Sequence, residues 1–134
     1  MARTVLTFGT FDVFHLGHLR VIQRAAELGD RLVVGVSADS LNLAKKGREP
    51  VFGERERMAI VAALKPVDEV FLEESLERKR EYLERYGADV LVMGDDWRGR
   101  FDEFSDLCEV VYLPRTPAIS TTALIEKISG GDGA

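Results

Sequence analysis

The chain has 134 residues, of which 46% are hydrophobic and 31% are charged, and its formal net charge is -5. This length and composition predict one globular domain with a substantial core. The acidic balance argues against broad binding to nucleic acids or membrane surfaces, because both are polyanions. A single cysteine excludes an internal disulfide framework. No secretory signal and no apolar run near the ~20 residues of a membrane span is visible, so we expect a cytoplasmic protein.

Apolar runs alternate with segments of helical periodicity along the chain. The apolar runs predict five buried strands, over 5–8, 31–37, 68–72, 90–93 and 109–113. Helical spacing predicts helices over 17–26, 54–64, 76–86 and 120–128, with shorter ones over 39–44 and 101–107. This alternation is typical of a parallel sheet with right-handed crossovers and helices on both faces. We expect a single Rossmann-like α/β domain with strand order 3-2-1-4-5 over residues 1–129, followed by a flexible tail over 130–134.

The stretch from Gly9 to His18 connects the first strand to the first helix. Such a turn lies at the carboxyl end of a strand, where α/β sheets bind ligands, and the N-terminus of a helix favours an anion. Gly9 and Gly17 allow backbone to approach a bulky ligand. The only histidines of the chain, His15 and His18, lie three residues apart in this turn and can face one anion.

Two other interpretations of the histidine pair are open. A histidine is often a hydrogen-bonded structural group, and it is also the commonest metal ligand. A zinc site needs three or four ligands, whereas Cys108 is far along the chain and no third histidine exists. We therefore expect no metal site built from a cluster of side chains.

Basic and hydroxyl side chains recur at the predicted loops on one edge of the sheet. The cationic ones are Lys45, Lys46, Arg48, Arg57, Lys65 and Arg115, and the hydroxyls are Ser120, Thr121 and Thr122. A ligand with several phosphates would suit this rim in an otherwise acidic protein. The sequence has no GxxxxGK[ST] stretch, no GxGxxG after the first strand and no serine nucleophile elbow. A P-loop protein, a dinucleotide-binding protein and a hydrolase with such an elbow are therefore disfavoured.

Three segments resemble a known family. Gly9-Thr10-Phe11-Asp12 followed by His15-Leu16-Gly17-His18 resembles the HxGH nucleotidyltransferases. The segments 93–97 and 115–122 resemble those of the small bacterial glycerol-3-phosphate cytidylyltransferases, and the likeness covers about residues 4–128. The resemblance implies transfer of CMP from CTP to glycerol 3-phosphate, which yields CDP-glycerol and pyrophosphate. It also implies a homodimer and a place in the supply of teichoic-acid precursors.

The resemblance also implies roles for individual residues. His15, His18 and Arg115 would be catalytic, because they meet the charge that grows on the phosphates. The residues implied in nucleotide binding are Gly9, Thr10, Phe11, Asp12, His15, Gly17, His18, Lys46, Gly94, Asp95, Trp97, Arg115, Thr116, Ile119, Ser120, Thr121 and Thr122. Those expected at the acceptor are Lys45, Arg57, Lys65 and Lys79. Mg²⁺ would accompany the nucleotide, with Asp12 or Asp95 as its candidate protein contacts.

Two departures from the family pattern affect the acceptor more than the reaction class. Pro117-Ala118 stands where the family usually has Glu-Gly, and Lys65 stands where arginine is expected. Related adenylyltransferases share stretches like 46–50 and 63–68, so an enzyme that uses ATP and FMN or a sugar phosphate remains an alternative, as does CTP with phosphoethanolamine. A regulatory module that binds nucleotide without turnover is a third interpretation.

Overall fold

The computed structural model describes residues 2–114 and 120–130, and it contains a parallel sheet of five strands. The strands are β1 (Thr4–Gly9), β2 (Arg31–Ser37), β3 (Glu69–Glu73), β4 (Val90–Gly94) and β5 (Glu109–Leu113). Their spatial order is β3-β2-β1-β4-β5, which confirms the predicted topology. The winding reverses beside β1, because β1 pairs with β2 on one side and with β4 on the other.

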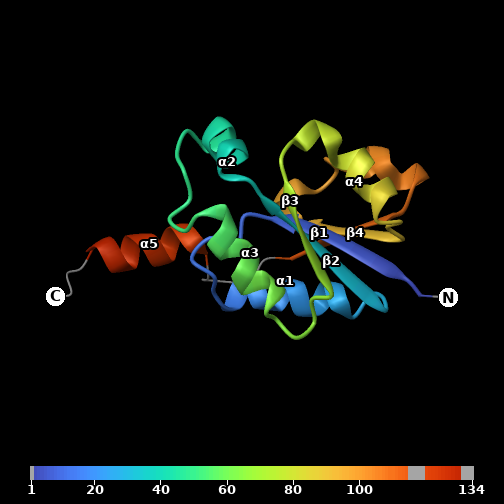
Figure 1. The fold of residues 1–134 in the computed structure, drawn as a ribbon, viewed down its shortest axis with the longest axis horizontal. Coiled ribbons are helices and arrows are strands. Elements are labelled where there is room, and N and C mark those ends of the chain that lie inside the picture. The colour runs from blue at the N-terminus through green and yellow to red at the C-terminus, as the bar shows by residue number, and fades with distance from the viewer. Residues whose placement is uncertain (1, 115–119, 131–134) are drawn as a thin grey trace.

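In the part of the chain that the structure describes, four helices lie in the connections between β1 and β4, and a fifth follows β5 (Figure 1). They are α1 (Leu16–Ala26), α2 (Asp39–Lys46), α3 (Glu54–Ala62), α4 (Lys79–Arg85) and α5 (Thr121–Gly130). Short 3₁₀ turns cover 76–78, 95–97 and 102–106. Within the described residues, no helix is long and apolar enough to cross a membrane.

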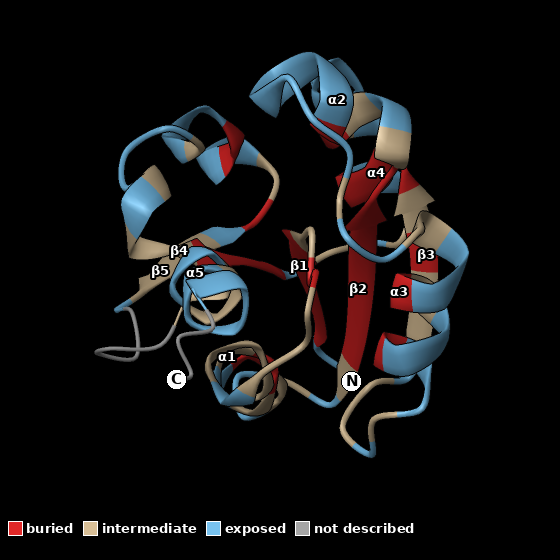
Figure 2. Ribbon diagram, turned by 90° about the vertical axis from the view of Figure 1, so that its left-hand side faces the viewer, coloured by how far each residue is buried: buried red, intermediate tan, exposed pale blue. Residues whose placement is uncertain are grey.

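Alternate residues of the central strands point to opposite faces of the sheet, as the two-residue period of a strand requires. On one face, Val5 packs with Ile22 of α1 and Val61 of α3. On the other face, Leu6 packs with Leu83 of α4 and with Phe104. Both faces of β1 and β2 are therefore buried, which explains why these strands are almost continuously apolar (Figure 2).

The structure differs from the predicted elements at three places. Lys45 and Lys46 lie in the last turn of α2 and not in the predicted loop. The helix expected over 76–86 starts as a 3₁₀ turn, and Leu76 is 38% exposed. In the last helix we expect Leu124, Ile125 and Ile128 to face inward; Leu124 and Ile125 are half-buried, whereas Ile128 is 72% exposed, so the prediction fails only for Ile128. Gly130 of the predicted tail closes α5, and residues 131–134 lie outside the described residues.

Candidate active site

The turn after β1 holds two residues in a strained backbone conformation. Phe11 has φ 54° and Val13 has φ 48°, and neither is glycine. A positive φ is especially unfavourable for a β-branched residue such as Val13 and persists only where the surroundings impose it. The Phe11 ring folds back over Gly9, where an added Cβ would lie 2.9 Å from ring carbons. Gly9 is thus required by this turn itself.

Two buried charged side chains hold the turn in place. The carboxylate of Asp12 accepts hydrogen bonds from the backbone N–H groups of Val51 and Phe52, at 2.7 and 2.8 Å. The guanidinium of Arg57 donates to the carbonyl oxygen of Thr10 at 2.8 Å. It also donates to the carbonyl oxygen of Phe52 and forms an ion pair with Asp39. These bonds tie the turn to the segment that precedes α3.

His15 and His18 form a reciprocal cap at the start of α1. Nδ1 of His15 accepts the Gly17 N–H at 3.0 Å, and Nδ1 of His18 accepts the His15 N–H at 3.1 Å. The two rings stack with centroids 3.8 Å apart. Because each Nδ1 is an acceptor, the ring proton of each histidine resides on Nε2. The Gly17 N–H is used in the cap, so the imidazole Nε2–H groups, and not this amide, are presented to a ligand.

Both histidines are neutral near pH 7. Burial lowers the pKa of His15, and burial, together with repulsion from His15, lowers the pKa of His18 to about 4 despite the opposing effect of Asp12. The two Nε2 atoms lie 3.3 and 3.5 Å from Oγ1 of Thr121 at the start of α5. This hydroxyl donates to the carbonyl oxygen of Asp12 at 3.0 Å. The oxygen of this hydroxyl can therefore accept hydrogen bonds from the two Nε2–H groups, in the position that a ligand oxygen would occupy.

A cavity of about 380 Å³ opens at the carboxyl end of β1, beside this histidine pair. Of the predicted nucleotide-binding residues, it is lined by Gly9, Thr10, Phe11, Asp12, His18, Lys46, Gly94, Thr121 and Thr122. No neighbour lies within 4 Å of a Cβ placed on Gly94, so this glycine leaves open space. The cavity is large enough for a small-molecule site of ordinary size.

A second cavity of about 160 Å³ adjoins the first. The two share Phe8, Gly9, Thr10 and Lys46 as lining residues. Lys45 and Lys79, both predicted to contact the acceptor, line this smaller cavity together with Lys46, and Trp97 lines it as well. Burial, with repulsion from Lys46 and Lys79, lowers the pKa of Lys45, whereas Glu73 raises it. Three cationic side chains therefore surround a space beside the larger cavity.

Two of the predicted acceptor residues do not face either cavity. Arg57 is fully buried, and its guanidinium is occupied by protein oxygens, so it supports the turn and does not reach a ligand. Lys65 is exposed and lies just before Asp68, whose carboxylate accepts the N–H of Leu32 near the start of β2. That places Lys65 at the amino edge of the sheet, opposite the cavities. These two acceptor predictions are corrected accordingly.

The candidate magnesium contacts are also engaged within the protein. Both carboxylate oxygens of Asp12 accept backbone hydrogen bonds, as described above. Asp95 pairs with the Arg98 side chain at 2.5 Å. Within residues 2–114 and 120–130, no group of three or more His, Cys, Asp or Glu side chains could hold a metal ion. The residues present do not fit a metal site built by the protein alone.

Several predicted residues lie near the cavities without lining the larger one. His15 reaches it through Thr121, and Ser120 caps α5 by accepting the Ala123 N–H. Gly17 and Asp95 make the internal contacts given above. Arg115, Thr116 and Ile119 lie outside the described residues, as do Pro117 and Ala118.

The structure adds residues that sequence reasoning did not single out. Asn42 of α2 is buried, lines the larger cavity and accepts a hydrogen bond from the Thr10 hydroxyl at 2.9 Å. Glu49, Pro50 and Val51 line the same cavity. Glu49 and Pro50 belong to the stretch 46–50 that is shared with related adenylyltransferases, but that likeness does not place them at the turn. They meet it only through folding, as the 39-residue separation of Asp12 and Val51 illustrates.

The chain is similar to several known proteins over most of its length. The family model described as Cytidylyltransferase-like matches residues 6–127. A Bacillus subtilis protein named glycerol-3-phosphate cytidylyltransferase is 46% identical over 128 residues, which cover 96% of this chain and 98% of its own. A Staphylococcus aureus protein of the same name is 38% identical over 130 residues, covering 97% and 98%. The crystal structure of a lipopolysaccharide core biosynthesis protein from Thermoplasma volcanium is 26% identical with a TM-score of 0.74, covering 87% of this chain and 99% of that one.

Proposed function

This chain belongs to the cytidylyltransferase-like family, and we propose that it transfers CMP from CTP to glycerol 3-phosphate. An oxygen of the acceptor phosphate attacks the α-phosphorus of CTP, the bond to the β-phosphate bridge breaks, and pyrophosphate leaves. The product is CDP-glycerol. The observation that carries this proposal is the pair of adjoining cavities at the end of β1, one beside the neutral histidine pair and one among three lysines.

The geometry supports a division of labour between the cavities. The larger cavity would hold CTP, with the Nε2–H groups of His15 and His18 donating to phosphate oxygens in place of the Thr121 hydroxyl. Neutral imidazole donors suit this task, because they stabilise growing negative charge without needing to be protonated first. Lys45 and Lys79 would hold the acceptor phosphate in the smaller cavity. Phosphoryl transfer needs little more than such positioning and charge stabilisation.

Mg²⁺ is proposed as a companion of the nucleotide and not as a resident ion. Because Asp12 is occupied and Asp95 is paired with Arg98, triphosphate oxygens and water would supply most of its coordination. The proposed roles of Arg115, Thr116 and Ile119 rest on the family resemblance.

A substrate grid tests this function directly. Pyrophosphate release is measured with CTP or ATP against glycerol 3-phosphate, FMN, a sugar phosphate and phosphoethanolamine. The proposal expects the highest kcat/KM for CTP with glycerol 3-phosphate. Preference for ATP and FMN or a sugar phosphate would assign the alternative transferase, and tight CTP binding without turnover on any acceptor would assign a regulatory module.

We also propose that the chain forms a homodimer through the β3 edge. β3 ends the sheet in the described residues, so its outer hydrogen-bonding groups face outward. Beside it lies a groove of about 470 Å³ between α3 and β3, whose apolar lining is Met58, Ala59, Ala62, Val67 and Val70. Sedimentation velocity should give twice the chain mass, and Met58→Glu should shift it to the monomer. A monomer at all concentrations would reject this assembly.

The cellular setting follows from the proposed reaction. We propose that the enzyme works in the cytoplasm and supplies an activated glycerol phosphate for teichoic-acid precursors. Accumulation of CDP-glycerol in the cytosolic fraction, and its loss on deletion of the protein, would support this. CDP-glycerol unchanged by the deletion would reject it.

A further inference from the structure

Lys79 and Glu73 form an ion pair beside the smaller cavity, and both are almost completely buried. Nζ of Lys79 lies 2.9 Å from Oε2 of Glu73, and the two residues are 2% and 1% exposed. Burial lowers the pKa of Lys79, and Glu73 raises it. Without the carboxylate, a lysine at this depth would tend to lose its proton.

Two aromatic rings flank the Lys79 ammonium beside the smaller cavity. Nζ lies 3.9 Å from the ring centroid of Phe8 and 4.9 Å from that of Phe101, and ring faces attract a cation. Among the described residues, Glu73 is the one carboxylate in ion-pair contact with Lys79. An ammonium has three N–H donors, and Lys79 itself lines the cavity.

Glu73 is anchored where three strands end. Its Oε1 lies 3.3 Å from Oγ of Ser37, and the same Oγ lies 3.3 Å from the carbonyl oxygen of Gly9. The backbone oxygen of Glu73 accepts the Ala38 N–H at 2.8 Å. The carboxylate is therefore positioned relative to the end of β1, where the two cavities meet.

We propose that Glu73 is a positioning residue for the acceptor: it keeps the Lys79 ammonium charged and aimed into the smaller cavity, where its other N–H groups bind the acceptor phosphate. This inference rests on the proposed function. The carboxylate touches no substrate and acts through Lys79. Lys45 and Lys46 are the charged groups that α2 places around the same cavity, so Glu73 also offsets the mutual repulsion of three cations before the phosphate arrives.

The test compares Glu73→Gln with Glu74→Gln. The second substitution removes the same charge one residue along the chain, at an exposed side chain. Glu73→Gln should raise the KM for glycerol 3-phosphate about 10- to 100-fold, the scale for a hydrogen bond to a charged group, with the KM for CTP changed less than threefold. Glu74→Gln should leave both near the wild-type values.

The pH dependence separates an electrostatic role from a merely structural one. Removing Glu73 lowers the pKa of Lys79, so the lysine loses its proton at a lower pH. The alkaline limb of kcat/KM for glycerol 3-phosphate should therefore move to lower pH in Glu73→Gln and stay in place in Glu74→Gln. The proposal would be overturned if the alkaline limb lay at the same pH in Glu73→Gln and Glu74→Gln. It would also be overturned if Glu73→Gln raised the KM for CTP as much as the KM for glycerol 3-phosphate.

A double-mutant cycle with Lys79→Met tests whether Glu73 acts through the lysine. Once Lys79 is absent, Glu73→Gln should change the KM for glycerol 3-phosphate by less than twofold. If Glu73→Gln raised the KM for glycerol 3-phosphate as much in the Lys79→Met background as in the wild type, the proposal would be contradicted. If Glu73→Gln does not fold, Ser37→Ala is used in its place. Ser37→Ala removes one anchor of the Glu73 carboxylate and leaves the ion pair with Lys79 intact. Ser37→Ala should raise the acceptor KM alone, and an unchanged acceptor KM would overturn the proposal.

The wild-type protein distinguishes the two levels of inference. If it releases no pyrophosphate with CTP and glycerol 3-phosphate, the proposed function is wrong. If it is active and Glu73→Gln behaves like Glu74→Gln, the function stands and the role of Glu73 is wrong.

Discussion

The hydroxyl of Thr121 lies 3.3 Å from Nε2 of His15, although the two residues are 106 positions apart in the chain. The hydroxyl also donates to the backbone of the strained turn, so α5 contacts the site through its first residue. In the proposed reaction, a phosphate oxygen of CTP accepts the hydrogen bonds of the imidazoles, and the freed hydroxyl of Thr121, which lines the larger cavity, donates to the same phosphates.

Thr121 is therefore expected to contribute to nucleotide binding through its oxygen. Thr121→Val keeps the shape and removes the hydroxyl, and it should raise the KM for CTP by up to about tenfold, the scale of one neutral hydrogen bond. Thr121→Ser keeps the hydroxyl and should stay within about twofold of the wild type. Steady-state pyrophosphate release measures both variants, and equal KM values for Val and Ser would contradict the role.

The two nitrogens of His15 have different tasks, and two substitutions separate them. Asparagine places an oxygen near the Nδ1 position and can keep the cap, but it has no donor at Nε2. His15→Asn should lower kcat about 10²- to 10³-fold with little change in stability. His15→Gln should keep more activity and lose about 1 kcal/mol of stability, because the cap is gone. Single-turnover assays and urea denaturation check the pair, and near-normal kcat in His15→Asn would contradict this assignment.

The lowered pKa of His18 predicts a pH-dependent stability. The folded value is about 4 and the unfolded value is near 6.5, so the unfolded chain binds the proton first as the pH falls. The contribution of His18 is complete above pH 6.5 and is lost progressively between pH 6.5 and 4. Urea denaturation at a series of pH values should show this slope, and His18→Asn should reduce it. An equal slope in the variant would exclude His18 as its source.

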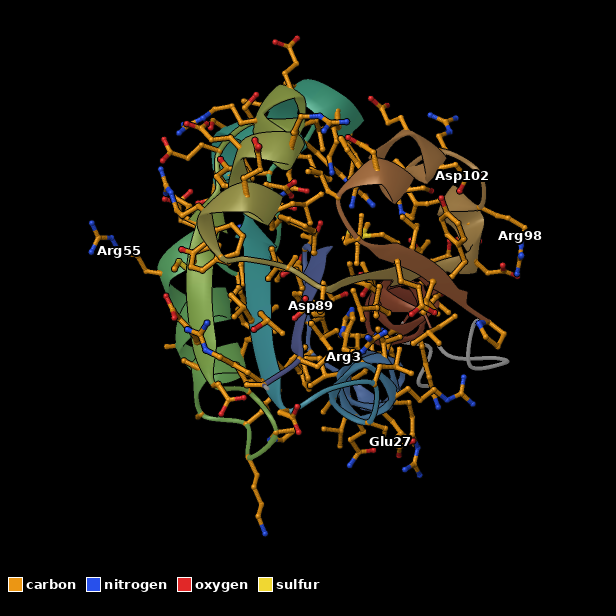
Figure 3. The ribbon with its side chains drawn as sticks, turned by 90° about the vertical axis from the view of Figure 1, so that its right-hand side faces the viewer. Arg3, Glu27, Arg55, Asp89, Arg98 and Asp102 are labelled. Carbon is orange, nitrogen blue, oxygen red and sulfur yellow. The ribbon has the colours of Figure 1, made fainter. Side chains whose placement is uncertain are left out.

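Arg57 should matter for stability far more than its neighbour Arg55. Arg57 is fully buried, whereas Arg55 on the same helix points away from the body of the protein (Figure 3). Lysine cannot reproduce the three bonds of the Arg57 guanidinium, so Arg57→Lys should cost about 3 kcal/mol or more. Arg55→Lys should cost less than about 0.5 kcal/mol. Chemical denaturation measures both, and equal stabilities would contradict the support that we assign to Arg57.

Lys65 should be dispensable for catalysis. It lies at the amino edge of the sheet, and the cavities lie at the carboxyl edge. Lys65→Ala is expected to keep kcat and both KM values within about twofold, whereas Lys79→Met should raise the KM for glycerol 3-phosphate at least about tenfold. A large change in the acceptor KM for Lys65→Ala would return it to the acceptor site, for instance by contribution from a second copy of the chain.

The positions of three predicted acceptor lysines show how little residue type alone can predict about a site. Lys45, Lys65 and Lys79 were equivalent as cationic side chains in predicted loops or helices. The structure brings Lys45 and Lys79 to one cavity and leaves Lys65 at the other edge. The edge depends on the connection in which each residue lies: Lys45 and Lys79 follow the carboxyl ends of β2 and β3, whereas Lys65 lies between α3 and the start of β3.

The sequence by itself determined the parallel sheet, its strand order and the place of the histidine pair. The elements and the histidine turn follow from local patterns, because apolar runs, helical spacing and the residues of one turn act over short stretches of chain. The strand order follows from the doubly wound fold class that alternating strands and helices indicate. Only the tertiary structure decided that Asp12 and Arg57 support the turn, that Glu73 pairs with Lys79, and that Asn42 reaches the larger cavity. Those contacts join different elements, so their geometry exists only after the sheet has formed and its helices have packed.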